Sequence, residues 1–244
     1  MKENTKTHSA MYGDKEVIFE LERKDVKNIN LNVRPDMSVA VSANSEVPLD
    51  FIEDFVRQKA PWIVKNINYF KKAQPEVRRY KELVSGETVR YLGRQYRLRV
   101  EPSNEEYVKF LRGFIYIYVK DVDDYRKKQK LFQEWMRHRA EIIFTDSLDR
   151  MYPVIKKYGV EKPEINIREM KARWGSCIKM SNTILLNLEL IKAPKYCIDY
   201  VVLHELIHFK YRNHDDNFYG LLSVLMPDWN ERKALLDEEI VRIL

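Results

Sequence analysis

Alternating apolar and polar positions predict β-strands in the first half of the chain. Apolar side chains recur at every second position within residues 16–42, 88–101 and 107–119, which is the period of a half-buried strand. A helix is predicted between these strands, from Pro48 to about Phe70, with Asp50 as its expected cap. On the apolar side of this helix we expect Phe51, Ile52, Phe55 and Ile63.

The second half is predicted to be mainly helical. A long helix is expected from about Val122 to Tyr158, which Pro153 could break. Short strands near residues 165–168 and 183–188 precede a helix that begins at Pro194, a favoured first-turn position, and two further helices are separated at Pro227. The expected fold class is therefore α+β. A β-rich, mildly basic N-terminal domain with one helix would cover residues 1–120, and a mainly helical domain with a small sheet would cover residues 121–244.

The helix that begins at Pro194 carries polar residues in an apolar run. Nearly every residue from Tyr196 to Phe209 is apolar, which predicts a buried helix, yet His204, Glu205 and His208 lie within it. Burying a neutral polar group without a partner costs about 2–7 kcal/mol, a cost that a metal ion bound to both imidazoles would remove. The two histidines are four residues apart and project from one face, about 6 Å apart along the axis. His-Glu-x-x-His on a helix is the zincin signature, in which the glutamate reaches a metal-bound water without being a ligand.

A third metal ligand is expected from His214, ten residues after His204. Three histidines and a water form the ligand set of a catalytic zinc site, so we expect one Zn²⁺ ion. Glu231 on a later helix, as in gluzincins, is the alternative ligand, and Asp215 is a weaker one. The competing interpretation is that two histidines are hydrogen-bonded in the core and the third is on the surface.

The segment before His214 lacks the glycine that makes the corresponding turn in metzincins. Tyr211 occupies that position. Asn213 could make the turn in the left-handed conformation, and Asp215 or Asp216 could cap the helix that follows.

Several segments together resemble a known family. They are Tyr91–Arg94, Pro61–Ile63, Arg173–Cys177, Asn182–Leu190, Tyr200–His208 and Asn213–His214 with Phe218–Tyr219. With them the chain resembles the YgjP-like metallopeptidases, bacterial relatives of the SprT-like zinc proteases, over its full length. The resemblance implies a zincin-like catalytic domain, with zinc held by His204, His208 and His214 and Glu205 as general base. Tyr219 stands where the family usually has tryptophan, which leaves the ligands untouched.

A mechanism follows from the expected metal. Zinc lowers the pKa of its water towards about 7, and Glu205 takes a proton as that water attacks a carbonyl carbon, then returns it to the leaving amine. The oxyanion needs a second electrophile, for which Arg173, Tyr211 and Tyr219 are the candidates. The Thr183–Leu188 strand could border the cleft and pair with an extended peptide; packing in the core is an equal alternative.

Composition points to the cytoplasm and away from membranes. No apolar stretch approaches the roughly 20 residues of a membrane span, and Met1–Tyr12 lacks the apolar core of a signal peptide. Cys177 and Cys197, the two cysteines, form no Cys-x-x-Cys pair, so we expect free thiols in a reducing compartment.

The expected substrate is a protein or peptide, and nucleic acid is a possible second partner. Residues 1–120 hold 22 Lys and Arg against 17 Asp and Glu, a balance of +5 within the chain's +6. The basic residues cluster at Lys71–Lys72, at Arg78, Arg79 and Lys81, and at Arg90, Arg94, Arg97 and Arg99. We favour solvated faces for these clusters. For Phe114, Tyr116 and Tyr118 we favour core packing over stacking on single-stranded nucleic acid.

Three functions therefore remain open. The chain could be a zinc peptidase acting on extended protein, such a peptidase docked on DNA through its basic half, or a non-enzyme that zinc staples together. The oligomeric state is left open.

Overall fold

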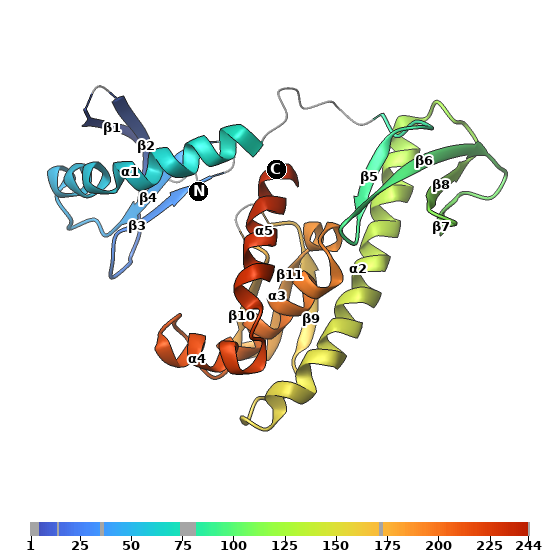
Figure 1. Ribbon diagram of the computed structural model, residues 1–244. Coiled ribbons are helices and arrows are strands. Elements are labelled where there is room, and N and C mark those ends of the chain that lie inside the picture. The colour runs from blue at the N-terminus through green and yellow to red at the C-terminus, as the bar shows by residue number, and fades with distance from the viewer. Residues whose placement is uncertain (1–4, 14, 35–36, 74–81, 171–172, 244) are drawn as a thin grey trace. The chain divides into compact units, whose positions relative to one another are not determined.

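The computed structural model of the chain describes residues 5–13, 15–34, 37–73, 82–170 and 173–243 (Figure 1). It divides the chain into two compact units, Met1–Arg78 with Glu238–Leu244, and Arg79–Asp237. Runs of strands are followed by helices along the chain rather than alternating with them one by one, so the α+β class is confirmed.

The first unit is a four-stranded sheet with one helix. Its strands are β1 (Thr5–Tyr12), β2 (Lys15–Arg23), β3 (Asn30–Val33) and β4 (Val39–Ala43), in the order β1-β2-β4-β3. The helix is α1 (Leu49–Ala73), which buries Ile52, Val56 and Ile63 against this sheet. Asp50 lies in the first turn of α1, and Phe51, which we expected on the apolar side, is 61% exposed.

Within the described residues, the second unit combines two sheets and four helices, the last of which begins in this unit and ends in residues assigned to the first. One sheet has the order β5-β6-β8-β7 and the other β10-β11-β9. The strands are β5 (Thr88–Tyr91), β6 (Arg94–Pro102), β7 (Tyr107–Leu111), β8 (Phe114–Val119), β9 (Glu164–Arg168), β10 (Gly175–Ile178) and β11 (Thr183–Asn187). The helices are α2 (Tyr125–Lys156), α3 (Lys195–His208), α4 (Asp216–Leu225) and α5 (Trp229–Ile243), with short 3-10 turns at η1 (Lys179–Ser181) and η2 (Leu188–Lys192).

The sheet of β5–β8 shares one hydrophobic core with α2 and α3. The boundary between the two units therefore differs from the one we expected. Leu98 and Ile115 from this sheet belong to the same buried cluster as Phe144 of α2 and Leu203 of α3. Strands that share a core with helices do not form a domain apart from them. The division therefore lies near residue 78, where we had expected it at residue 120.

The aromatic residues of β8 lie on the side of the sheet away from this core. Ile115, Ile117 and Val119 are buried, whereas the alternating Phe114, Tyr116 and Tyr118 are half-buried, so they occupy the opposite face. The expectation that these three rings pack in the core is wrong.

Helix α2 continues through Pro153, where we had left a break open. Pro153 lies in the last turn of α2. The helical hydrogen bond that its missing N–H removes is therefore near the end of the helix, and few helical bonds follow it. The C-terminal half of α2 is fixed to α3 by Asp199, whose carboxylate accepts hydrogen bonds from Ser147 at 2.6 Å and Arg150 at 2.7 Å.

Helix α3 is buried on almost every side, as its apolar run predicts. Its N-terminal end lies against the β5–β6 turn. The backbone N–H of Leu92 donates to Ile191 and that of Gly93 to Lys192, at 3.0 and 2.9 Å. A Cβ on Gly93 would lie 2.7 Å from Cγ of Pro194, so this turn approaches α3 as closely as only glycine permits.

The three-stranded sheet places β10 at its edge and β11 in its centre. Because β11 pairs with β10 on one side and β9 on the other, the Thr183–Leu188 segment has no free edge for a peptide. Its residues are mostly buried. Of the two roles expected for this segment, core packing therefore fits and pairing with an extended peptide does not. Of the helices within the described residues, none is long and apolar enough to span a membrane.

Candidate metal centre

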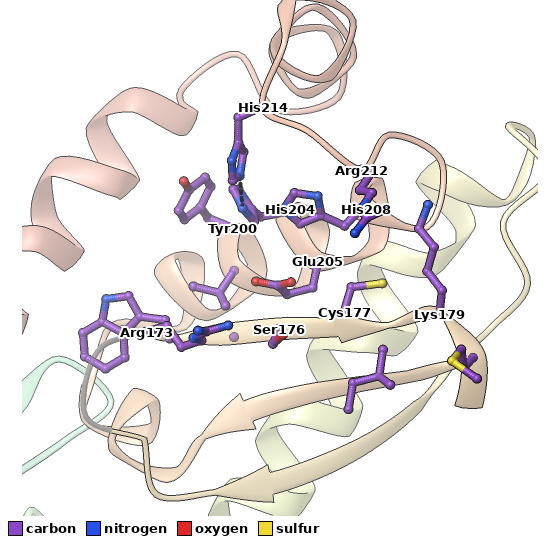
Figure 2. Close-up of a pocket in the computed structure, with 15 residues that line it drawn as sticks. Arg173, Ser176, Cys177, Lys179, Tyr200, His204, Glu205, His208, Arg212 and His214 are labelled. Carbon is purple, nitrogen blue, oxygen red and sulfur yellow. Dashed lines mark hydrogen bonds between the residues drawn. The ribbon is translucent and has the colours of Figure 1, made fainter. Parts of the chain in front are cut away.

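Three histidines meet on one side of α3 (Figure 2). His204 and His208 lie one turn apart on α3, and the segment between α3 and α4 brings His214 to them. Their ring centroids are 4.7–4.9 Å apart, and one donor atom from each lies within 4.8 Å of the others. Nε2 of His204 and Nε2 of His214 are 2.9 Å apart. Glu231 and Asp215 are not part of this group.

The protonation states of the three rings suit a cation. Burial, with the neighbouring histidines, lowers the pKa of His204 to about 3, and burial also lowers the pKa of His208 and of His214. All three imidazoles are therefore neutral near pH 7, the form that binds metal.

Hydrogen bonding also orients the ring of His208. Nδ1 of His208 lies 3.0 Å from the carbonyl oxygen of Tyr211, so Nδ1–H donates there and Nε2 keeps its lone pair for a ligand. Nδ1 of His204 is buried without a hydrogen-bond partner among the described residues. Coordination through Nε2 of His204 would offset part of the cost of burying that ring, so the donor set fits a zinc ion.

The segment that delivers His214 is built without glycine or a left-handed residue. The backbone N–H groups of Lys210 and Tyr211 both donate to the carbonyl of Ile207, at 3.0 and 2.9 Å, so helical hydrogen bonding continues to Tyr211. Asn213 is not among the residues with positive φ, and the expectation that it makes the turn is wrong.

Asp215 caps the following helix. Its side chain accepts a hydrogen bond from the N–H of Phe218 at 3.0 Å, as expected for one of the two aspartates. A carboxylate engaged in this way at the start of α4 is not free to act as the weaker alternative ligand.

The side chain of Glu205 extends from α3 to the edge strand β10. Its side chain is nearly fully buried, and burial raises its pKa to about 8, although Arg173 and the backbone N–H of Cys177 act to lower the pKa. The approach is very close at Gly175, where an added Cβ would lie 2.8 Å from both Cγ and Oε1 of Glu205. A carboxylate with a pKa near neutrality is suited to take up and release a proton.

A cavity of about 850 Å³ opens onto the histidines and Glu205. Residues 173–180 form one wall, and α3 with the segment after it forms the other (Figure 2). Arg173 lines this cavity, whereas Tyr211 and Tyr219 do not. The ring of Tyr219 lies behind the site, where it stacks on His214 with centroids 6.0 Å apart and on Trp229 with centroids 5.2 Å apart.

The cavity also contains groups that the sequence analysis did not assign. Tyr200 lines it and contacts His204, with ring centroids 5.8 Å apart. Its position four residues before His204 on a helix was the available signal, since such residues share a face. Lys179 and Arg212 add positive charge to the lining, in which Glu205 is the one acidic residue described.

The family model for the YgjP-like metallopeptidase domain matches residues 27–239. Among solved structures, the metallopeptidase zymogen abylysin of Pyrococcus abyssi is 20% identical, with a TM-score of 0.37, and covers 41% of this chain and 96% of its own. The zymogen jannalysin of Methanocaldococcus jannaschii is 23% identical, with a TM-score of 0.34, and covers 40% of this chain and 96% of its own. Likeness at this level supports no conclusion about the site. No curated protein matches the chain.

Proposed function

The chain belongs to the YgjP-like metallopeptidase family, and from this premise we propose that it is a zinc-dependent peptidase with one ion held by His204, His208 and His214. The observation that carries the proposal is the meeting of three neutral imidazoles beside a buried carboxylate in an open cavity. Metal-dependent peptidase activity is the property of the family; the ion, its ligands and the roles below are our assignment.

Glu205 is the general base of the proposed reaction. A zinc ion held by the three imidazoles would supply Lewis acidity, which would lower the pKa of water and so make hydroxide available as a nucleophile near neutral pH. Glu205 takes a proton from the attacking water as the new C–O bond forms, and gives it to the amine nitrogen as the C–N bond breaks. Its close packing on Gly175 holds the carboxylate in place for both transfers.

The developing oxyanion requires a hydrogen-bond donor from the protein. Arg173 and Tyr200 are the candidates, because both line the cavity. Tyr200 keeps its proton at neutral pH, since burial strongly raises the pKa of its phenol. Tyr211 and Tyr219, the other two candidates from the sequence, lie outside the lining.

We assign the substrate as a polypeptide in an extended conformation. The edge strand β10 forms part of the cavity wall, and a free strand edge binds an extended peptide through backbone hydrogen bonds. Arg173, Lys179 and Arg212 give the lining positive charge, so peptides with acidic side chains near the cleaved bond should react faster than the same peptides with lysine there.

Metal analysis and turnover together test the proposal. Elemental analysis of the purified chain should give one zinc, and the His204→Ala and His214→Ala variants should lose it, whereas Glu231→Gln should keep it. Glu205→Gln should also keep its zinc and its melting temperature but lose about 10²–10⁴-fold in kcat on an unstructured protein substrate. Unchanged turnover in Glu205→Gln would contradict the assigned base. Zinc bound without any turnover in the unmodified chain would favour the staple function.

We place the protein in the cytoplasm. Cys177 is half-buried and forms no disulfide within the described residues, and cysteines outside disulfides are typical of reducing compartments.

A further inference from the structure

The sheet β5-β6-β8-β7 has one face that the core does not use. Ile115 and Ile117 point from β8 into the core that contains α2. The opposite face therefore carries Phe114, Tyr116 and Tyr118 of β8. In the register of the sheet, Tyr107 of β7 lies beside Tyr118 on this same face.

These four rings form a continuous row. Tyr107 stacks on Tyr118 with centroids 4.6 Å apart and planes at 27°, and Tyr116 is nearly parallel to Tyr118, at 5.9 Å and 9°. Phe114 follows at 6.3 Å from Tyr116. The row lies on β8, which is an inner strand, and on its neighbour β7. The rings therefore lie over the face of the sheet.

Basic side chains flank the row. The register places Arg97 beside Phe114, and both Arg99 and Lys109 beside Tyr116. The guanidinium carbon of Arg99 lies 4.2 Å from the centroid of Phe114. All three basic residues are exposed, and none forms an ion pair with another residue in the described part of the chain.

A hollow adjoins the row at its Phe114 end. Its volume is about 380 Å³, and Arg97, Arg99, Glu101 and Phe114 contribute to its lining. Glu101 is half-buried and lies beside Tyr118 in the register. On this face the three basic residues, Arg97, Arg99 and Lys109, therefore outnumber Glu101, the acidic residue that β6 contributes.

We propose that this face binds single-stranded nucleic acid. Bases stack on aromatic side chains whatever their sequence, because every base has a π-face, and arginine and lysine bind the phosphates between them. A duplex keeps its base faces stacked internally, so a row of rings on an open sheet selects unpaired strands. None of the residues of this face lines the metal cavity, so the site is separate from the proposed peptidase centre.

Fluorescence polarisation with labelled oligonucleotides of about ten nucleotides tests this site on the full chain. Single-stranded DNA and RNA should bind at about 50 mM salt, and the matching duplex should bind more weakly. Tyr116→Ala should raise Kd for the single strand about 5- to 150-fold, the loss of one stacked base. The double change Arg97→Gln and Arg99→Gln should reduce the slope of log K against log salt by about 1.4, the loss of two phosphate contacts.

Two variants outside the face control for general effects. Phe51→Ala removes an exposed ring of α1, and Lys156→Gln with Lys157→Gln removes two charges at the C-terminal end of α2. Both should bind as the unmodified chain does. Because Arg97 and Arg99 are exposed, their replacement should cost only the contact of Arg99 with Phe114 and leave the chain folded, which keeps the test valid even if Tyr116→Ala is unstable.

The proposal is overturned if no single strand binds at about 100 μM protein in low salt. It is overturned equally if a folded Tyr116→Ala variant binds as the unmodified chain does, since charge alone would then explain binding. Tighter binding of the duplex, or of an acidic peptide in competition with the oligonucleotide, would also refute it.

Discussion

Replacing Gly175 by alanine would test whether the position of Glu205 controls turnover. The new Cβ would lie 2.8 Å from Cγ and from Oε1 of Glu205, at least 0.6 Å closer than the 3.4 Å at which ordinary contacts begin. Gly175 is on the wall opposite α3, and the backbone of β10 is fixed by pairing with β11. The carboxylate is therefore the group that has to move.

The magnitude follows from that displacement. A misplacement of about 1 Å in a catalytic group can cost about 10²-fold in rate, so we expect kcat of Gly175→Ala to fall about 10- to 100-fold. Overpacking typically lowers the free energy of unfolding by about 1–3 kcal/mol. The histidines are not touched, so the bound zinc should stay at the level of the unmodified chain.

The assay combines kcat on an unstructured protein, metal content and urea unfolding. Gly220→Ala is the matched control, because Gly220 lies in α4 with nothing within 4 Å of its added Cβ. It should leave kcat unchanged and raise stability by up to about 1 kcal/mol, the helix preference of alanine. Full turnover in a zinc-loaded Gly175→Ala variant would refute the idea that this contact positions the base.

Further predictions concern the surroundings of the site. Gly93 and Gly113 both have positive φ, but of the two only Gly93 would place a Cβ against another element. In urea unfolding, Gly93→Ala should therefore lower the unfolding free energy by about 1–3 kcal/mol more than Gly113→Ala does. Equal losses in the two variants would contradict the close approach of Gly93 to α3. Burial and the nearby Glu205 carboxylate raise the pKa of Cys177 to about 11, above the usual 9.0, so its thiolate is scarce at pH 8 and grows as the pH rises through 11. Its alkylation by iodoacetamide should be about 100-fold slower at pH 8 than that of an ordinary thiol, and an ordinary rate would refute the shift. Asp199→Asn should lower the unfolding free energy by about 1–3 kcal/mol, because it weakens a charge-assisted hydrogen-bond network between α2 and α3; an unchanged urea midpoint would show that this network contributes nothing.

The local repeat of apolar and polar positions was sufficient to predict most helices and strands and the placement of His204 beside His208. The helices α2 and α3 lie close to their expected bounds, because each is a long segment of one pattern. The segments 88–101 and 107–119 form strands as expected, but a turn divides each of them into two strands. His204 and His208 share a helix face by spacing alone. Segments without a clear repeat were missed, namely the polar strand β1 and the short strand β10.

Features that depend on distant contacts could not be obtained from the pattern. Alternation in β8 divides its residues between two faces but does not say which face meets the core, and the isoleucines rather than the aromatic rings pack there. The domain boundary was misplaced for the same reason, since only the shared core shows that β5–β8 accompany the helices. The contact of Gly175 with Glu205 joins residues 30 positions apart, and no local signal marks it.

If the second unit binds zinc as proposed, the burial of α3 couples the stability of that unit to the ion. The helix that presents two of the three donor imidazoles is buried on almost every side in the second unit, so loss of the proposed ion would leave the buried ring of His204 without compensation and lower the resistance of this unit to unfolding. In a cell short of zinc, such a protein would be degraded rather than persist as an idle enzyme. Its abundance would then report the zinc supply before any loss of activity per molecule could be seen.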